Sequence, residues 1–309
     1  MNMDFKRKLP IPMVVKEMYP ISAEGAQAKR KKDLELEKVF TGKSDRMLLV
    51  IGPCSADRED AVMDYITRLR GLQDRVSDKI VMVPRIFTNK PRTAGVGYMG
   101  MLHRPDPNSR EDVFAGLIAK RKLHMRALNE TGFSCSDELL YPEDYKYLSD
   151  LLSYVTVGAR SVEDQFHRLT ASGLDIPVGM KNPTSGDLSV MLNAIKSAQA
   201  GHIFIYRGWE VESTGNPLAH AILRGYVDPD GKNHSNYHFD NILKLNDLYQ
   251  AKGLQNPALI VDVNHSNSGK QYLEQIPIAK EVIRSSKEHP EIKKLLKGLM
   301  IESYIEDGC

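Results

Sequence analysis

From Met47 onward, the chain alternates short β-branched runs with longer amphipathic stretches. The runs suited to buried strands lie near residues 47–52, 80–86, 133–136, 154–159, 177–181, 202–206, 258–263 and 299–303. The amphipathic stretches, which we expect to be helices, lie near 58–74, 109–130, 142–152, 161–172, 186–200, 238–252 and 270–288. This alternation is typical of parallel strands joined by crossover helices. Eight such strands predict an α/β fold, the (β/α)8 TIM barrel, of roughly 250 residues.

The first 46 residues do not follow this alternation. Leu9–Tyr19 is interrupted by proline, and Ala23–Val39 is a charged helical stretch before a glycine-containing turn. We therefore expect an N-terminal extension, residues 1–46, that serves oligomerisation or regulation, and a catalytic barrel, residues 47–309. The segment Arg207–Tyr237 is predicted to be a long loop, and loops of that length are commonly functional or mobile.

The predicted barrel lacks its final helix. Seven helices follow the eight strands, because only Tyr304–Cys309 remains after the last strand. In a closed barrel the eighth helix covers the outer face of the last strand. We expect a truncated chain; the alternative is that the N-terminal extension or a partner chain covers that face.

Composition limits the classes of function. Apolar residues make up 41% and charged residues 27%, as in ordinary globular proteins, and no apolar stretch approaches the ~18 residues of a membrane span. Met1–Lys8 is charged and has no apolar core, so no secretory signal is visible. The three distant cysteines, Cys54, Cys135 and Cys309, cannot form a disulfide framework. With a net charge of +2, these features predict a cytoplasmic protein that binds neither nucleic acid nor membrane.

Cationic side chains follow many of the predicted strands. Barrel active sites lie at the carboxyl ends of the strands, so these cations are expected to converge there. Guanidinium and ammonium groups bind phosphates and carboxylates. A single such cation is as often solvated or paired with an acid. Together, however, the six predict phosphorylated or carboxylated substrates: Arg85, Lys90, Arg92, Arg160, Lys181 and Arg224.

Cys54, His265 and Glu302 are candidate metal ligands at the ends of three different predicted strands. Thiolate, imidazole and carboxylate groups all bind Mn, Fe, Co or Zn. Considered singly, each is better explained as a reduced thiol, a hydrogen-bonded histidine or an ion-pair partner. Spacing alone therefore does not establish a metal site. Cys135 lies within a predicted strand and is assigned to packing, and Cys309 to the terminus.

Six short strings occur in one order along the predicted barrel. They are Gly52-Pro53-Cys54-Ser55, Lys90-Pro91-Arg92-Thr93, Gly158-Ala159-Arg160, Leu223-Arg224-Gly225, Asn264-His265-Ser266-Asn267-Ser268-Gly269-Lys270 and Glu302-Ser303. Each string alone is weak, but the ordered set resembles the class I, alpha-branch 3-deoxy-D-arabino-heptulosonate 7-phosphate (DAHP) synthases. The N-terminal segment also resembles the extension of that branch.

The resemblance implies a role for each matching position. It makes Cys54, His265 and Glu302 ligands of a divalent metal, which is Mn, Fe, Co or Zn. It places one group of residues around phosphoenolpyruvate: Arg85, Glu138, Ala159, Arg160, Lys181 and Arg224. It places Lys90 between the two substrates as the catalytic residue, and Pro91, Arg92 and Thr93 at erythrose 4-phosphate.

The implied activity is the condensation of phosphoenolpyruvate with D-erythrose 4-phosphate to DAHP and phosphate, the first step of the shikimate pathway. The resemblance also implies a homodimer or homotetramer. An aromatic amino acid effector would act at the N-terminal extension and the Arg207–Tyr237 loop. The sequence departs from the family pattern at its end, where an aspartate in a Ser-x-Thr-Asp segment supplies a fourth metal ligand. The sequence stops at Cys309 before that segment, and a chain that ended there would bind metal weakly and turn over slowly.

Three alternatives remain at this stage. A 3-deoxy-D-manno-octulosonate 8-phosphate synthase would use a longer sugar, but its equivalent of Lys90-Pro91-Arg92-Thr93 has the sequence Ala-Asn-Arg-Ser. A Schiff-base aldolase on the same fold would use Lys181 as nucleophile. A non-catalytic binding or regulatory chain would bind phosphoenolpyruvate without turnover.

Overall fold

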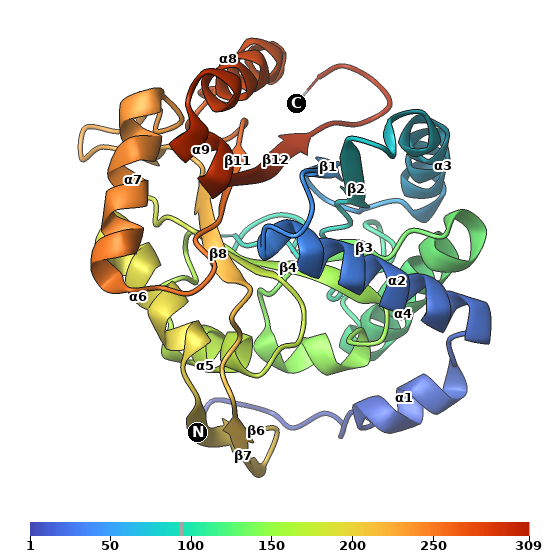
Figure 1. Cartoon of the computed structure of the whole chain (residues 1–309). Helices are drawn as coiled ribbons and strands as arrows, with labels where there is room; N and C mark the ends of the chain where they lie inside the picture. Colours follow the sequence, from blue (N-terminus) through green and yellow to red (C-terminus); the bar gives the residue numbers. More distant parts are fainter. Residues whose placement is uncertain (93–94, 309) are drawn as a thin grey trace.

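The computed structural model describes residues 1–92 and 95–308. Within these residues, eight parallel strands form one sheet in the order β2-β1-β12-β11-β8-β5-β4-β3. The bounds are β1 Met47–Gly52, β2 Ile80–Pro84, β3 Cys135–Glu138, β4 Leu152–Val157, β5 Val178–Lys181, β8 Ala219–Leu223, β11 Leu259–Asp262 and β12 Leu296–Glu302. A parallel bridge between Arg85 and Ser136 joins the two edge strands into a nearly closed barrel (Figure 1). The predicted TIM-barrel fold is confirmed.

Helices alternate with the strands and surround them (Figure 1). They are α3 Glu59–Val76, α4 Val113–Thr131, η1 Pro142–Tyr147, α5 Gln165–Ser172, α6 Leu188–Gln199, α7 Phe239–Lys252, η2 Tyr272–Glu274, α8 Gln275–Glu288 and α9 Pro290–Leu295. Local signals set their ends: the Asp112 side chain accepts from Ala115 N at the start of α4, and Gly132 ends that helix with a φ of 71°. The helix predicted at 142–152 is instead the short 3₁₀ turn η1, because β4 begins only a few residues later.

The sixth barrel strand is not the predicted one. Residues 202–206 form β6 (His202–Tyr206), which pairs antiparallel with β7 (Trp209–Ser213) in a separate hairpin. The barrel strand is β8, inside the segment predicted to be a loop, where the small strands β9 (Tyr226–Val227) and β10 (Asn233–His234) also pair. The β-branched and aromatic residues of β6 have higher strand propensity than the alanines of β8. Only burial inside the barrel makes β8 a strand.

The N-terminal segment closes one end of the barrel. It contains α1 (Pro12–Met18) and α2 (Ala23–Phe40), and α2 lies across that end in Figure 1. Leu36, Val39 and Phe40 of α2 are buried against the inward-facing side chains of the strands. The Phe40 ring lies 4.2 Å from the His220 ring, centroid to centroid. Because α2 covers the amino ends of the strands, the opposite end is left for a functional site.

The outer face of β1 and β12 is only partly covered. The described residues after β12 form no helix, and Leu49, Ile51 and Ile301 on this face are half-buried. No helix in the described part of the chain is long and apolar enough to cross a membrane.

Candidate active site

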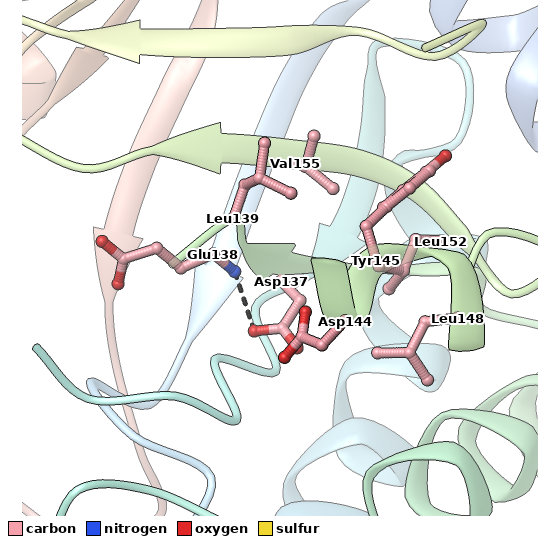
Figure 2. Close-up of a pocket in the computed structure, with 8 residues that line it drawn as sticks. All are labelled: Asp137, Glu138, Leu139, Asp144, Tyr145, Leu148, Leu152 and Val155. Atoms are coloured by element: carbon pink, nitrogen blue, oxygen red, sulfur yellow. Dashed lines mark hydrogen bonds between the residues drawn. The ribbon is translucent and has the colours of Figure 1, made fainter. Parts of the chain in front are cut away.

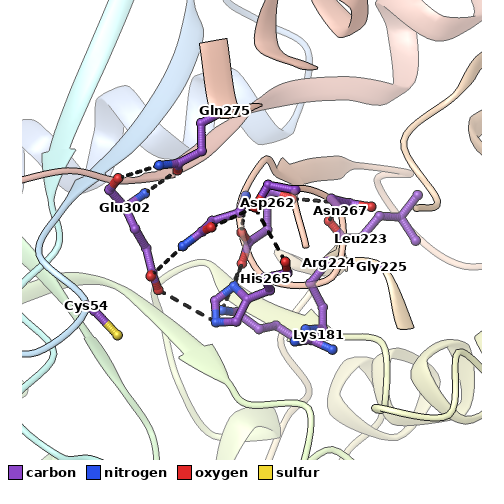
Figure 3. A network of polar contacts seen from close by, with 12 residues as sticks. Cys54, Lys181, Leu223, Arg224, Gly225, Asp262, His265, Asn267, Gln275 and Glu302 are labelled. Atoms are coloured by element: carbon purple, nitrogen blue, oxygen red, sulfur yellow. Dashed lines mark hydrogen bonds and ion pairs between the residues drawn. The ribbon is translucent and has the colours of Figure 1, made fainter. Parts of the chain in front are cut away.

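Side chains from different strands converge at the carboxyl end of the barrel. Figure 3 shows Lys181, Arg224, His265 and Glu302 facing one another there. Lys181 ends β5, Arg224 follows β8, and Glu302 ends β12. Parallel pairing brings the ends of these strands to one edge, so residues far apart in the sequence become neighbours.

Arg85 is the most enclosed of the predicted cations, with 2% of its surface exposed. Its Nη2 lies 2.8 Å from Glu302 Oε1, and its Nε donates to Pro53 O at 3.2 Å. The guanidinium carbon lies 4.0 Å from the centre of the Phe87 ring. A Cβ at Gly52 would lie 2.5 Å from the Arg85 carbonyl oxygen, so glycine is required at this strand end. These contacts fix one guanidinium face and leave Nη1 without a partner among the described residues.

Glu302 is held on both sides. Its Oε2 accepts from Asn264 Nδ2 at 2.6 Å, and its main-chain N and O bond the Gln275 side chain at 2.9 and 2.8 Å. Burial raises the pKa of Glu302, but the positive charge of Arg85 and the neighbouring His265 outweigh it and lower the pKa to about 2. Glu302 is therefore an ionised carboxylate at neutral pH.

His265 is oriented by Asp262. Its Nδ1 lies 2.9 Å from Asp262 Oδ2, and its Nε2 lies 3.6 Å from Glu302 Oε1. The backbone of His265 has a φ of 51°, a conformation that costs a non-glycine residue of order 1–3 kcal/mol and is common at functional sites. Burial lowers the pKa of His265, opposed by Asp262. A neutral ring with its proton toward Asp262 presents the Nε2 lone pair, the form in which histidine binds metals.

Asp262 is a site residue that our sequence analysis missed. It is fully buried, and its Oδ2 also lies 3.1 Å from Lys181 Nζ. The pKa of Asp262 is well below its usual value, because His265 and Lys181 outweigh the effect of burial. The available signal was an acidic residue at the end of an apolar strand. Asp262 thus joins a predicted metal ligand to a predicted substrate ligand.

Figure 3 marks no contact between Cys54 and the His265–Glu302 pair. Cys54 is exposed, and Lys90 Nζ lies 2.5 Å from its Sγ. Across residues 1–92 and 95–308, no three His, Cys, Asp or Glu side chains are close enough to enclose an ion. The chemistry of the three predicted donors suits a divalent ion, and His265 has the carboxylate partner that metal-bound histidines usually have. Ligation by all three stays a prediction.

Arg224 is a second buried cation with a free donor. It is 7% exposed, and its main-chain N donates to Asn182 Oδ1 at 3.0 Å. Its Nη1, like Nη1 of Arg85, has no partner among the described residues. Buried donors are rarely left unpaired, because an unmade hydrogen bond costs about 1–3 kcal/mol. Two such guanidinium groups at the carboxyl end of the barrel therefore favour an anionic ligand.

Glu138 also lies near Lys181 and Arg85. Burial raises the pKa of Glu138, opposed by Lys181 and Arg85. A Cβ on Gly158 would collide with the Glu138 carboxylate, so glycine lets this side chain lie against β4. The remaining predicted residues lie nearer the surface: Ala159 and Pro91 are half-buried, Arg160 and Arg92 are exposed, and Thr93 lies outside the described residues.

Comparison with known proteins agrees with this geometry. Residues 18–309 match the model of the DAHP synthetase I family. The Tyr-sensitive phospho-2-dehydro-3-deoxyheptonate aldolase of Escherichia coli K12 is 35% identical over 97% of this chain and 82% of the relative. The Phe-sensitive enzyme of that strain is 33% identical over 99% and 85%. A solved phospho-2-dehydro-3-deoxyheptonate aldolase from Francisella tularensis SCHU S4 has a TM-score of 0.89 at 28% identity, covering 97% of this chain and 86% of that one. The chain belongs to the DAHP synthetase I family.

Proposed function

We propose that this chain condenses phosphoenolpyruvate with D-erythrose 4-phosphate to give DAHP and phosphate, the first step of the shikimate pathway. The observation that carries the proposal is a pair of buried guanidinium groups beside the His265–Glu302 pair, whose Nη1 donors have no partner in the part of the chain that the structure describes. Two such guanidinium groups suit a small anion that carries both a phosphate and a carboxylate. Membership of the family supports the same reaction.

Cations at the carboxyl end of the barrel bind phosphoenolpyruvate in this proposal. Arg85 and Arg224 each offer an Nη1 that no described residue engages, and Lys181 Nζ is held by Asp262. Arg160, with the backbone at Ala159, completes the contact to the phosphate. Because Asp262 and Glu302 already fix one side of Lys181 and Arg85, these cations are preorganised and lose little freedom on binding.

Lys90, Pro91, Arg92 and Thr93 bind erythrose 4-phosphate in this proposal. The enol carbon of phosphoenolpyruvate forms a bond to the aldehyde carbon, water adds at the carbon that carries the phosphate, and the C–O bond to phosphate breaks. The ammonium of Lys90, which contacts Cys54, stabilises or protonates the alkoxide that develops from the aldehyde.

The same proposal assigns Cys54, His265 and Glu302 to a divalent metal, which is Mn, Fe, Co or Zn. When bound, such an ion supplies Lewis acidity for the aldehyde oxygen. Asp262 keeps the Nε2 of His265 available, and Arg85 keeps Glu302 ionised. These two neighbours prepare nitrogen and oxygen donors before any ion arrives.

Choice of the sugar tests this function against the longer-sugar synthase. Purified chain with Mn²⁺ is given phosphoenolpyruvate and either erythrose 4-phosphate or arabinose 5-phosphate, and phosphate release is measured. We expect release with the four-carbon sugar. Faster release with arabinose 5-phosphate would contradict the assignment.

Trapping with borohydride tests the Schiff-base alternative. The Lys181 ammonium contacts the Asp262 carboxylate, so it is engaged in an ion pair rather than free to attack a carbonyl. We expect no covalent adduct after borohydride treatment with substrates. A reduced adduct on Lys181 would overturn the metal-assisted reaction in favour of an imine mechanism.

We also propose that an aromatic amino acid regulates the chain. A cavity of about 180 Å³ lies between η1, α5 and the β6–β7 hairpin, lined by Tyr145, Lys146, Thr170, Gly173, Leu174, Phe204, Tyr206, Val211, Glu212 and Ser213. Its aromatic wall suits a ring, and Lys146 and Glu212 suit the two charges of a free amino acid. Relatives named Tyr-, Phe- and Trp-sensitive support this proposal.

Two neighbouring residues of β7 provide a matched test of the cavity. Val211 lines it, whereas Glu210 pairs with Ile205 on the other face of the hairpin. We expect Val211→Arg to abolish inhibition by phenylalanine, tyrosine and tryptophan, and Glu210→Arg to leave it unchanged. Equal inhibition of both variants, or no inhibition of the wild-type chain by any of the three, would contradict the proposal.

A further inference from the structure

A second group of buried charges lies where α4, β3 and η1 meet. Lys120 on α4 is 1% exposed, and its Nζ lies 2.6 Å from Asp144 Oδ2 and 3.8 Å from Asp137 Oδ2. Both aspartates are buried, one on η1 and the other on β3. We call Lys120, Asp137 and Asp144 the buried charge network.

The two carboxylates of the network face each other (Figure 2). They border a cavity of about 10 Å³, whose other walls are mainly apolar. Two like charges in such surroundings repel each other, and burial penalises both. The ammonium of Lys120 offsets this repulsion, and the buried His124 ring also faces Asp137, with Nε2 3.6 Å from Asp137 Oδ2. Replacing a buried ion pair by apolar residues is often neutral or stabilising, so fold stability alone gives little reason for these charges.

Each carboxylate accepts a hydrogen bond from a residue one or two positions before Lys90, a predicted substrate-binding residue. Asp144 Oδ2 accepts from Asn89 Nδ2 at 3.0 Å, directly before Lys90. Asp137 Oδ1 accepts from Thr88 N at 2.9 Å and from Glu138 N at 2.7 Å. An antiparallel β-bridge also joins the backbones of Asn89 and Gly100. This bridge closes the base of the loop that carries Lys90 and Arg92. The network therefore fixes this loop at its base.

We propose that the buried charge network is a positioning device for the loop that binds the aldehyde substrate. Lys120 and Asp144 act through Asn89, which sets where the following Lys90 places its ammonium. The buried charge network acts on the loop, through Asn89 and Thr88, rather than on substrate. This inference rests on the proposed function, because it assigns residues 90–93 to erythrose 4-phosphate.

Asn89→Ala tests the device, with Asn216→Ala as the matched control. Both amides are buried, and Asn216 donates to Ala171 O and Ile176 O far from the loop. We expect Asn89→Ala to raise KM for erythrose 4-phosphate about tenfold, as loss of one hydrogen bond to a buried carboxylate would, and to change KM for phosphoenolpyruvate less than twofold. Asn216→Ala should lower Tm and change neither KM. Equal changes in both KM values, or none, would overturn the proposal.

Asp144→Asn provides a second variant that keeps the shape and an acceptor for Asn89. We expect the same selective change in KM, smaller in size. Hydrogen–deuterium exchange gives a readout that needs no substrate. Peptides covering residues 88–92 should exchange faster in Asn89→Ala than in the wild type and in Asn216→Ala. Unchanged exchange there would refute the positioning role even in a chain that failed to turn over, whereas faster exchange without turnover would contradict only the proposed function.

Discussion

Asp262 shows at the scale of single residues how the barrel prepares a reactive site. One carboxylate oxygen contacts both Lys181 Nζ and His265 Nδ1. Lys181 is predicted to bind phosphoenolpyruvate, and His265 is predicted to bind a divalent metal. Both contacts are made in a fully buried position, where electrostatic interactions are strong. Loss of this carboxylate would therefore disturb anion binding and the histidine orientation together.

Asp262→Asn should lower both stability and activity. Removing one partner of a buried ion pair leaves the other uncompensated, at a cost of about 3–5 kcal/mol in the free energy of unfolding. We expect that loss in urea denaturation. We also expect kcat/KM to fall by about 10- to 100-fold, the usual effect of removing the hydrogen-bond partner of a metal-binding histidine. Asp247→Asn on an exposed helix position is the control. A variant as stable and active as the control would refute the role of Asp262.

Lys90→Met tests the predicted catalytic lysine. The ammonium contacts Cys54 Sγ, and our proposal places it between the two substrates. If it stabilises the developing alkoxide, kcat should fall by about a hundredfold or more, the scale of a positioned proton donor. Steady-state kinetics check this, with circular dichroism to confirm folding. Near-normal turnover would remove Lys90 from the mechanism.

The sequence was a better guide to the cationic side chains at the strand ends than to the acidic residue that pairs with one of them. Arg85, Lys181 and Arg224 could be found because each follows a strand, and strand ends of a barrel meet at one rim. Asp262 was not selected, since its role depends on which side chains the pairing of β5, β8 and β11 brings beside it. The contact between Lys90 and Cys54 also joins distant loops, and local sequence does not encode it.

At the scale of elements, α4 connects the N-terminal segment to the barrel through Arg121. This fully buried side chain pairs with Asp150 through two hydrogen bonds of 2.9 and 2.8 Å. It also donates to the carbonyl oxygens of Tyr19 and Tyr147, each at 2.8 Å. One guanidinium therefore fixes the end of α1, η1 and the start of β4 together.

Arg121→Met should destabilise the chain far more than Arg126→Met on the same helix. Arg126 makes exposed ion pairs with Glu59 and Glu130, which contribute little. Loss of Arg121 leaves buried acceptors unpaired, and we expect about 3–5 kcal/mol less free energy of unfolding. Equal unfolding midpoints for the two variants would contradict this account of α4.

The Asp150 carboxylate makes part of this stability depend on pH. Burial raises its pKa, but hydrogen bonds and charge from Arg121 outweigh burial, so its pKa in the folded state is below the usual value. The contribution is therefore fully present above the unfolded pKa, about 4, and is lost as pH falls through the folded pKa. We expect Asp150→Asn to flatten the acid limb of a plot of Tm against pH. An unchanged acid limb would show that the pair does not contribute.

Most elements could be predicted because periodicity and caps are local signals. The exception, β6 against β8, is informative: β6 has the residues of a buried strand, yet Ile203 and Ile205 are 69% and 76% exposed. The alanine-rich β8 is buried between β5 and β11 instead. Where small side chains are needed inside a barrel, strand propensity misleads, and only the closed sheet decides.

At the scale of the whole molecule, the β6–β7 hairpin is a projecting apolar surface. Ile203 and Ile205 share one face of the hairpin, beyond the barrel (Figure 1). Exposed apolar patches commonly mark protein–protein contacts. This supports our expectation of a homodimer or homotetramer, with the hairpin at a subunit contact.

Ile203→Glu/Ile205→Glu should reduce the mass measured by light scattering to that of a smaller assembly. The control is Leu34→Glu/Leu72→Glu, which adds the same charges at two exposed apolar residues of α2 and α3. We expect the control to keep the wild-type mass. If both double variants have the wild-type mass, the hairpin does not form the contact.

The most direct measurement is consumption of phosphoenolpyruvate by purified chain stripped with EDTA and then supplied with Mn, Fe, Co or Zn. We predict consumption only when a divalent ion and erythrose 4-phosphate are both present, with one phosphate released per phosphoenolpyruvate lost. Consumption that persists in EDTA would contradict the proposed role of a metal bound by Cys54, His265 and Glu302. Consumption without the sugar phosphate would contradict the proposal that the strand-end cations hold two anionic substrates that react with each other.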